Sequence, residues 1–181
     1  GATVGAGLPL LRSVRDLRAG GDRILALGGV LSGTLAWLFD GWDGREAFSA
    51  RVRAAVARGF AEPDPRVDLS GEDVRRKLLI LARTAGRTLE EGEVQVESLL
   101  TPGLRAAGAG EVETRLSELD EPLAARAAEA ARSGRVLRYV ARLDEHGARA
   151  GLEALPADDP LALGRGQDNR VAIWSCRYRD R

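Results

Sequence analysis

Residues 135–156 read RVLRYVARLDEHGARAGLEALP, and apolar side chains recur at every second position. One alternating set is Leu137, Tyr139, Ala141 and Leu143, and the next is Ala148, Ala150, Leu152 and Ala154. A period of two is typical of strands that bury one face. Between the two sets lies Asp144-Glu145-His146-Gly147, which has the composition of a turn. The stretch therefore predicts an antiparallel hairpin.

Helical spacing dominates the sequence before this hairpin. It predicts helices at 10–19, 33–39, 48–59, 70–82 and 122–132, and short strands at 24–31, 93–97 and 171–178. Ser70 and Asp73 have the spacing of a capping box, which predicts that the fourth helix starts at Ser70. Helices come mainly first and the antiparallel strands last. We therefore expect one domain over residues 1–181, with an α+β fold and a mixed, largely antiparallel sheet covered by helices.

The composition excludes several classes of function. The chain has 27 basic and 27 acidic side chains, so it lacks the positive field that binds nucleic acid or anionic membranes. No apolar run approaches the roughly 18–20 residues of a membrane span. Cys176 and His146 are the single cysteine and histidine, which excludes a disulfide framework and a histidine-based zinc site. One cysteine suits a reducing compartment, so we expect a cytoplasmic protein.

Lys77 is the only lysine, among 26 arginines. Arginine stays charged near neutral pH and does not donate its proton, whereas a partly buried lysine can. Lys77 is therefore a candidate for proton transfer. The alternative interpretation is a charge on a solvated helix face.

Carboxylates gather around the segment that leads to Lys77. Glu62, Asp64 and Asp68 lie in a polar loop at 60–69 that two prolines stiffen, and Asp73 lies four residues before Lys77. Residues four apart share one face of a helix. Asp73 and Lys77 fit a surface ion pair, and the whole cluster fits a site that holds the ammonium of a zwitterionic substrate. Composition and spacing leave both interpretations open.

The segment EPDPRVDLSGEDVRRKL, residues 62–78, closely resembles homoserine dehydrogenases. The resemblance extends to 2–9, to the turn at 29–35, and to the late landmarks Asp159-Pro160-Leu161 and Gln167-Asp168-Asn169. It covers nearly the whole chain, and it is closest to the form fused behind an aspartate kinase. A homodimer through the sheet is also typical of the family.

The resemblance implies reduction of L-aspartate 4-semialdehyde to L-homoserine with NADP or NAD as cofactor, a step of threonine and methionine biosynthesis. Lys77 would donate the proton to the carbonyl oxygen, and Asp68 would support the site around it. Glu62 and Asp73 would bind the substrate amino group. The remaining implied residues are Gly33 and Thr34 at the substrate and nicotinamide end, Gly59 near the cofactor, and the carbonyls of Val4, Ala6 and Leu8 around a sodium ion.

The sequence also departs from the family pattern. Gly1 stands where a glutamate ligand of the sodium ion is usual, and Phe60, Ala61 and Val67 replace a tyrosine, a threonine and an aspartate. The chain looks truncated at both ends, without the dinucleotide-binding domain and the final tail, so the isolated chain is expected to be inactive or nearly so. Two other classes stay open: an assembly or regulatory domain without chemistry of its own, and an amino-acid-binding module.

Overall fold

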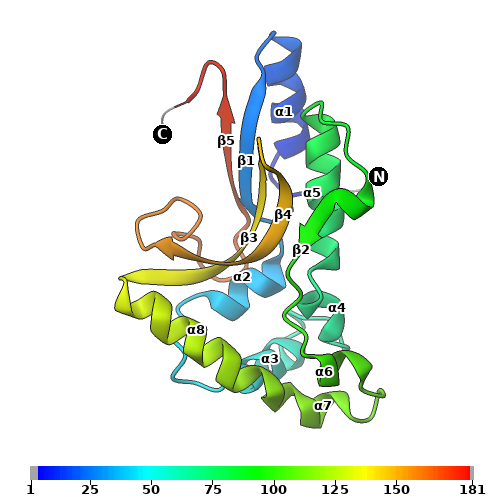
Figure 1. Ribbon diagram of the computed structural model, residues 1–181, viewed down its shortest axis with the longest axis vertical. Helices are drawn as coiled ribbons and strands as arrows, with labels where there is room; N and C mark the ends of the chain where they lie inside the picture. Colours follow the sequence, from blue (N-terminus) through cyan, green and yellow to red (C-terminus); the bar gives the residue numbers. More distant parts are fainter. Residues whose placement is uncertain (1–3, 180–181) are drawn as a thin grey trace.

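A five-stranded sheet organises residues 4–179, the part of the chain that the computed structural model describes (Figure 1). Its strands are β1 (Ile24–Val30), β2 (Val94–Val96), β3 (Arg135–Asp144), β4 (Gly147–Pro156) and β5 (Arg170–Ser175), in the order β2-β4-β3-β1-β5. Neighbouring strands are antiparallel except β2 and β4, which are parallel. The predicted mixed, largely antiparallel sheet is confirmed.

The central hairpin β3–β4 has the register that the sequence predicts. Tyr139 faces Leu152, and Asp144 faces Gly147 across the turn. His146 lies at this exposed turn, beside Glu145. The hairpin forms because its alternating pattern places one complete apolar face against the helices.

Helices fill the sequence around the strands. They are α1 (Leu10–Ala19), α2 (Gly33–Phe39), α3 (Phe48–Ala57), α4 (Arg66–Leu69), α5 (Glu72–Thr84), α6 (Pro102–Ala106), α7 (Val112–Arg115) and α8 (Asp120–Arg132), with short 3-10 turns η1 (Glu91–Glu93) and η2 (Leu116–Leu119). Figure 1 shows α5 running along the sheet beside β2, while α3, α6, α7 and α8 gather beyond one end of the sheet. The α+β class is confirmed.

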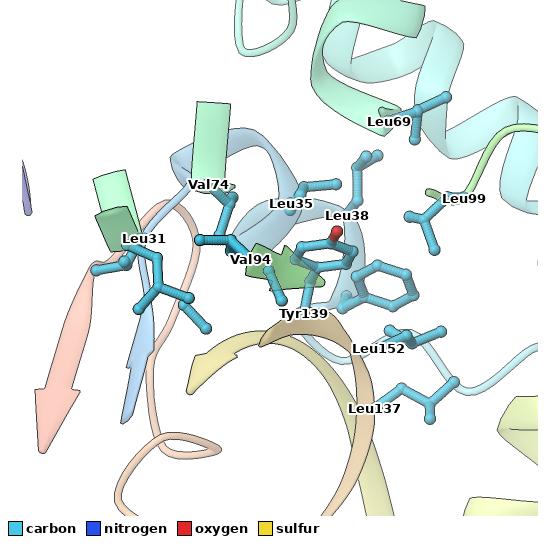
Figure 2. Close-up of a cluster of buried hydrophobic side chains, with 14 of the residues drawn as sticks. Leu31, Leu35, Leu38, Leu69, Val74, Val94, Leu99, Leu137, Tyr139 and Leu152 are labelled. Atoms are coloured by element: carbon cyan, nitrogen blue, oxygen red, sulfur yellow. The ribbon is translucent and has the colours of Figure 1, made fainter. Parts of the chain in front are cut away.

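The sheet separates two apolar clusters. The larger cluster lies between the sheet and α1, α2 and α5, and it includes Leu31, Leu35, Val74, Leu78 and Tyr139. Figure 2 shows part of it. The smaller cluster lies on the opposite face, where Leu161 and Ala162 cover Val30, Val140 and Leu155. Both faces of the central strands are therefore largely covered, and Val140 is completely buried.

Arg138 also lies on this opposite face, with only 7% of its surface exposed. Its guanidinium donates hydrogen bonds to the carbonyls of Phe39, Leu137 and Ala162 at 2.8 Å each. It thereby joins the end of α2 to the segment that covers the smaller cluster. Burial lowers the pKa of Arg138 from its ordinary value.

Three local predictions are wrong. Ser70 does not form the predicted capping box. Gly71 occupies the N-cap position of α5 with a left-handed φ of 76°, and the Ser70 hydroxyl donates to the carbonyl of Val67 and accepts from the amide of Glu72 at 3.2 Å. The last strand ends at Ser175 rather than at 178, because Ser175 and Tyr178 close a turn there. The loop at 60–69 contains the short helix α4.

Within residues 4–179, no helix combines the length and apolar character that crossing a membrane requires.

Candidate active site

The link between β1 and α2 forms the first wall of the site. The Ser32 hydroxyl accepts a hydrogen bond from the amide of Leu35 at 3.2 Å and so caps α2. Thr34 is nearly buried in the first turn, and its hydroxyl donates to the carbonyl of Phe60 at 2.7 Å. This bond fixes the loop after α3 against the start of α2.

That loop turns at Gly59, where α3 has ended. Gly59 has a left-handed φ of 69°, a backbone conformation that favours glycine. An added Cβ there would meet no atom within 4 Å, so the space beside Gly59 is open. The Phe60 ring packs edge-on against Trp37, with ring centres 5.6 Å apart. A pocket of about 430 Å³ opens at this place, and Thr34, Gly59, Glu62 and Asp68 are among its lining residues.

The carboxylates of the loop have different partners. Asp68, on α4, accepts a hydrogen bond from the backbone amide of Glu62 at 2.8 Å, which holds the Glu62 backbone in place. The Glu62 side chain makes no hydrogen bond or ion pair within the described residues, and the residue is exposed. Glu62 is therefore the carboxylate of this pocket that is free to bind a ligand.

Asp64 has a structural role instead. Its carboxylate accepts hydrogen bonds from Nε and Nη2 of Arg66, at 2.9 and 2.7 Å. This fork of charge-assisted bonds holds the pKa of Asp64 below its ordinary value. Arg66 also donates to the carbonyl of Ala107 at 2.6 Å, so the pair ties the loop to the segment after α6.

Lys77 is held by two acceptors. Its Nζ lies 2.9 Å from the carbonyl oxygen of Leu31 and 2.6 Å from Oδ2 of Asp73. The Lys77 side chain is 24% exposed and that of Asp73 is 55% exposed. An ammonium has three N–H donors, so one is left for a ligand once these two bonds are made within the described residues. Asp73 and Lys77 therefore project from one face of α5, as their spacing predicts, and they form the ion pair that the sequence left as one of two interpretations.

The predicted site residues thus form two neighbouring groups. One is the pocket with Thr34, Gly59, Glu62 and Asp68, and the other is the Asp73–Lys77 pair. Residues 31–34 connect them, since Leu31 accepts from Lys77 and Thr34 lines the pocket. No hydrogen bond or ion pair links Glu62 with Asp73 or Lys77 in the described structure.

A second predicted site lies in the turn before α1. Its backbone is unusual, with φ of 84° at Gly5 and 52° at Ala6, and Ala6 is the sole residue other than glycine with a positive φ in the described chain. The amide of Leu8 donates to the carbonyl of Gly5 at 3.0 Å. Gly1, where the family has an acidic residue, lies outside the described residues.

The sequence model of the family described as homoserine dehydrogenase matches residues 9–180. The chain belongs to the homoserine dehydrogenase family. A bifunctional aspartokinase/homoserine dehydrogenase 2 of Escherichia coli is 49% identical over 180 residues, which are 99% of this chain and 22% of the relative. The chain thus spans about a fifth of the length of that relative.

Solved structures share the fold. A protein of unknown function from Candida auris superposes with a TM-score of 0.91 at 37% identity, over 98% of this chain and 52% of that one. A hyperthermophilic archaeal homoserine dehydrogenase in complex with NADPH has a TM-score of 0.66 at 20% identity, over 95% of this chain and 44% of that one. The second likeness concerns the fold alone.

Within this homoserine dehydrogenase fold, some partners of the site residues could not be predicted from the sequence. The carbonyl of Leu31 accepts from Lys77, and the carbonyl of Phe60 accepts from Thr34. Every residue has a backbone carbonyl, so the sequence does not indicate which carbonyls act as acceptors. Gln167 lies over Gly33, since an added Cβ at Gly33 would be 3.4 Å from the Cβ of Gln167. The resemblance of 167–169 to the family was the one signal that could have placed this loop at the site.

Proposed function

We propose that this chain is the substrate-binding and catalytic domain of a homoserine dehydrogenase, which reduces L-aspartate 4-semialdehyde to L-homoserine with NADPH or NADH. The position of Lys77 carries the proposal. Two acceptors orient its ammonium and leave one N–H bond available beside residues 31–34. A proton donor must reach the oxygen that becomes negative during reduction, and this N–H bond is suited to that task.

In this mechanism Lys77 transfers its proton to the carbonyl oxygen of the semialdehyde. The nicotinamide supplies the hydride when bound. Glu62 and Asp73 bind the substrate ammonium, and Asp68 keeps the Glu62 backbone in place through its 2.8 Å hydrogen bond. General acid catalysis of this kind typically contributes about 10²–10⁴-fold to the rate.

We assign the pocket beside Gly59 to the nicotinamide end of the cofactor. The space beside Gly59 is open, and Thr34 also lines this pocket. The archaeal neighbour with bound NADPH supports a nicotinamide cofactor for this fold. Gly59 would then lie against the cofactor, while Gly33 and Thr34 would lie between the cofactor and the substrate.

We assign the turn before α1 as the sodium site. No hydrogen bond of the described residues ends on the carbonyl oxygens of Val4, Ala6 or Leu8, so these oxygens are available as ligands. A positive φ at a residue such as Ala6 costs about 1 kcal/mol or more, and binding of a cation by the turn would offset that cost.

The proposal includes two partners. A second copy of the chain would pack on the part of the outer sheet face where Ala26, Arg142 and Trp174 surround a shallow hollow. A monomeric mass in light scattering at tens of micromolar would count against this homodimer. The E. coli relative is a bifunctional protein, which supports fusion of this chain to an aspartokinase.

The test compares Lys77→Arg and Glu62→Gln in the longest natural polypeptide that contains this chain. Homoserine-dependent reduction of NADP and NAD is followed by absorbance. Lys77→Arg is expected to lower kcat about 100-fold or more with little change in KM, because arginine keeps the charge but not the transferable proton. Glu62→Gln is expected mainly to raise the KM for homoserine.

Other outcomes identify the alternatives. An amino-acid-binding module would bind homoserine, lose binding in Glu62→Gln and tolerate Lys77→Arg. An assembly domain would tolerate both substitutions and show no homoserine-dependent signal. Wild-type kcat in Lys77→Arg would show that Lys77 is only a charge on the face of α5.

A further inference from the structure

A buried tyrosine lies under the junction of α4 and α5. Tyr139, in the middle of β3, is 2% exposed, and its hydroxyl donates to the carbonyl of Glu97 at 2.7 Å. Burial raises the pKa of Tyr139 well above its ordinary value, so the hydroxyl keeps its proton and remains a donor. Figure 2 shows this hydroxyl oxygen at the edge of the ring, within a cluster whose other labelled side chains are all aliphatic.

The hydroxyl lies directly against the residue where α5 starts. An added Cβ at Gly71 would be 2.1 Å from the Tyr139 oxygen, far closer than two such atoms can approach. It would also be 2.9 Å from a methyl carbon of Val96. Gly71 therefore takes its left-handed conformation on a surface formed by Tyr139 and β2.

The end of α4 rests on the same support. The amide of Leu99 donates to the carbonyl of Leu69, the last residue of α4, at 3.0 Å. Tyr139 in turn holds the carbonyl of Glu97, two residues before Leu99. One buried hydroxyl thus contacts the start of α5 directly and the end of α4 through the segment 97–99.

This junction separates the two groups of the site. Asp68 is on α4 and holds the Glu62 backbone, whereas Asp73 and Lys77 are on α5. The angle at 69–71 therefore sets the distance between the two carboxylates that are proposed to bind one ammonium, those of Glu62 and Asp73. We propose that Tyr139 is a positioning residue, which sets this distance through Gly71 and the segment 97–99. The inference rests on the proposed function.

The kinetic test uses Tyr139→Phe in the longest natural polypeptide. Phenylalanine fills the volume of the ring but leaves the Glu97 carbonyl without its donor and Gly71 without its support. The KM for homoserine is expected to rise fivefold or more, while the KM for the cofactor changes less than twofold. Tyr178→Phe is the matched control, because Tyr178 is 64% exposed and its hydroxyl makes no hydrogen bond in the described structure.

A second control separates positioning from stability. Leu152 faces Tyr139 across the hairpin, and its backbone amide donates to the Glu97 carboxylate at 3.0 Å. Leu152→Val shortens a side chain of the same cluster and leaves this backbone bond and the hydroxyl of Tyr139 in place. It is expected to lower Tm and leave the KM for homoserine unchanged. The proposal is overturned if Tyr139→Phe leaves both KM values unchanged, or if Leu152→Val raises the homoserine KM equally.

A third measurement does not depend on catalysis. Because Lys77 is the only lysine, acylation of its peptide in the 181-residue chain can be followed by mass spectrometry. Tyr139→Phe is expected to speed this acylation threefold or more, since a displaced α5 loosens the bonds to Leu31 and Asp73. An unchanged rate refutes the positioning role even where homoserine proves not to be the substrate. A faster rate without homoserine-dependent activity overturns the proposed function alone.

Discussion

Replacing Gly71 by alanine tests how closely the sheet fits the start of α5. The new Cβ would lie 2.1 Å from the Tyr139 oxygen at a residue whose φ is 76°. The left-handed backbone costs a side chain about 1 kcal/mol or more. Displacing the hydroxyl breaks a buried hydrogen bond, worth about 1–3 kcal/mol, and crowding a packed core costs about 1–3 kcal/mol. These costs overlap, so we expect the free energy of unfolding to fall by about 3–5 kcal/mol.

Urea unfolding followed by tryptophan fluorescence measures this loss. Gly59→Ala is the matched control, because Gly59 has a similar φ of 69° but open space where the Cβ would go. Only the backbone cost remains there, so we expect a loss of about 1 kcal/mol. A Gly71→Ala variant as stable as Gly59→Ala would refute the close contact between Tyr139 and Gly71.

Three further outcomes follow from individual contacts. Arg138→Ala leaves three buried carbonyls without a donor, and calorimetry should show a loss of about 3 kcal/mol or more, with a smaller loss in Arg138→Lys. Ser32→Ala removes the cap of α2 and should cost about 1 kcal/mol in urea unfolding, and an unchanged midpoint would contradict the cap. Arg66 keeps the pKa of Asp64 lower in the folded chain than in the unfolded one, so their pair stabilises the fold above about pH 4, and this stability is lost as the pH falls through the folded pKa. Asp64→Asn should therefore make the acid limb of the stability profile shallower than in wild type.

The parts of the fold that the sequence predicts are those with local causes. The hairpin needs only an alternation of two and a turn, and both lie within residues 135–156. The start of α5 was misplaced because Gly71, rather than Ser70, takes the cap position against a strand that is distant in sequence. The Ser70 hydroxyl instead lies between the two helices, bonded to Val67 of α4 and to the first amide of α5. No local pattern distinguishes a serine in this position from one that occupies the N-cap itself.

The same limit applies to the site. The acidic residues of the loop at 60–69 and Lys77 were candidates because of their residue types, and the family resemblance implied their roles in binding and proton transfer. The acceptor that orients Lys77 is a backbone carbonyl 46 residues away, and the one that binds Thr34 is 26 residues away. Contacts of this kind depend on how β1, α2 and α5 pack, so they emerge only once the fold is known.

The pairing of β1 with β5 brings nearly opposite ends of the chain together. Ser175, at the end of β5, donates a hydrogen bond to Asp22, 153 residues earlier, just before β1. Closing a loop of that length costs about 4–5 kcal/mol in chain entropy, and this cost opposes the pairing of β1 with β5. During synthesis on the ribosome, β1 therefore remains an open edge until residues 170–175 have emerged. Until then, β1 exposes unpaired backbone to neighbouring nascent chains.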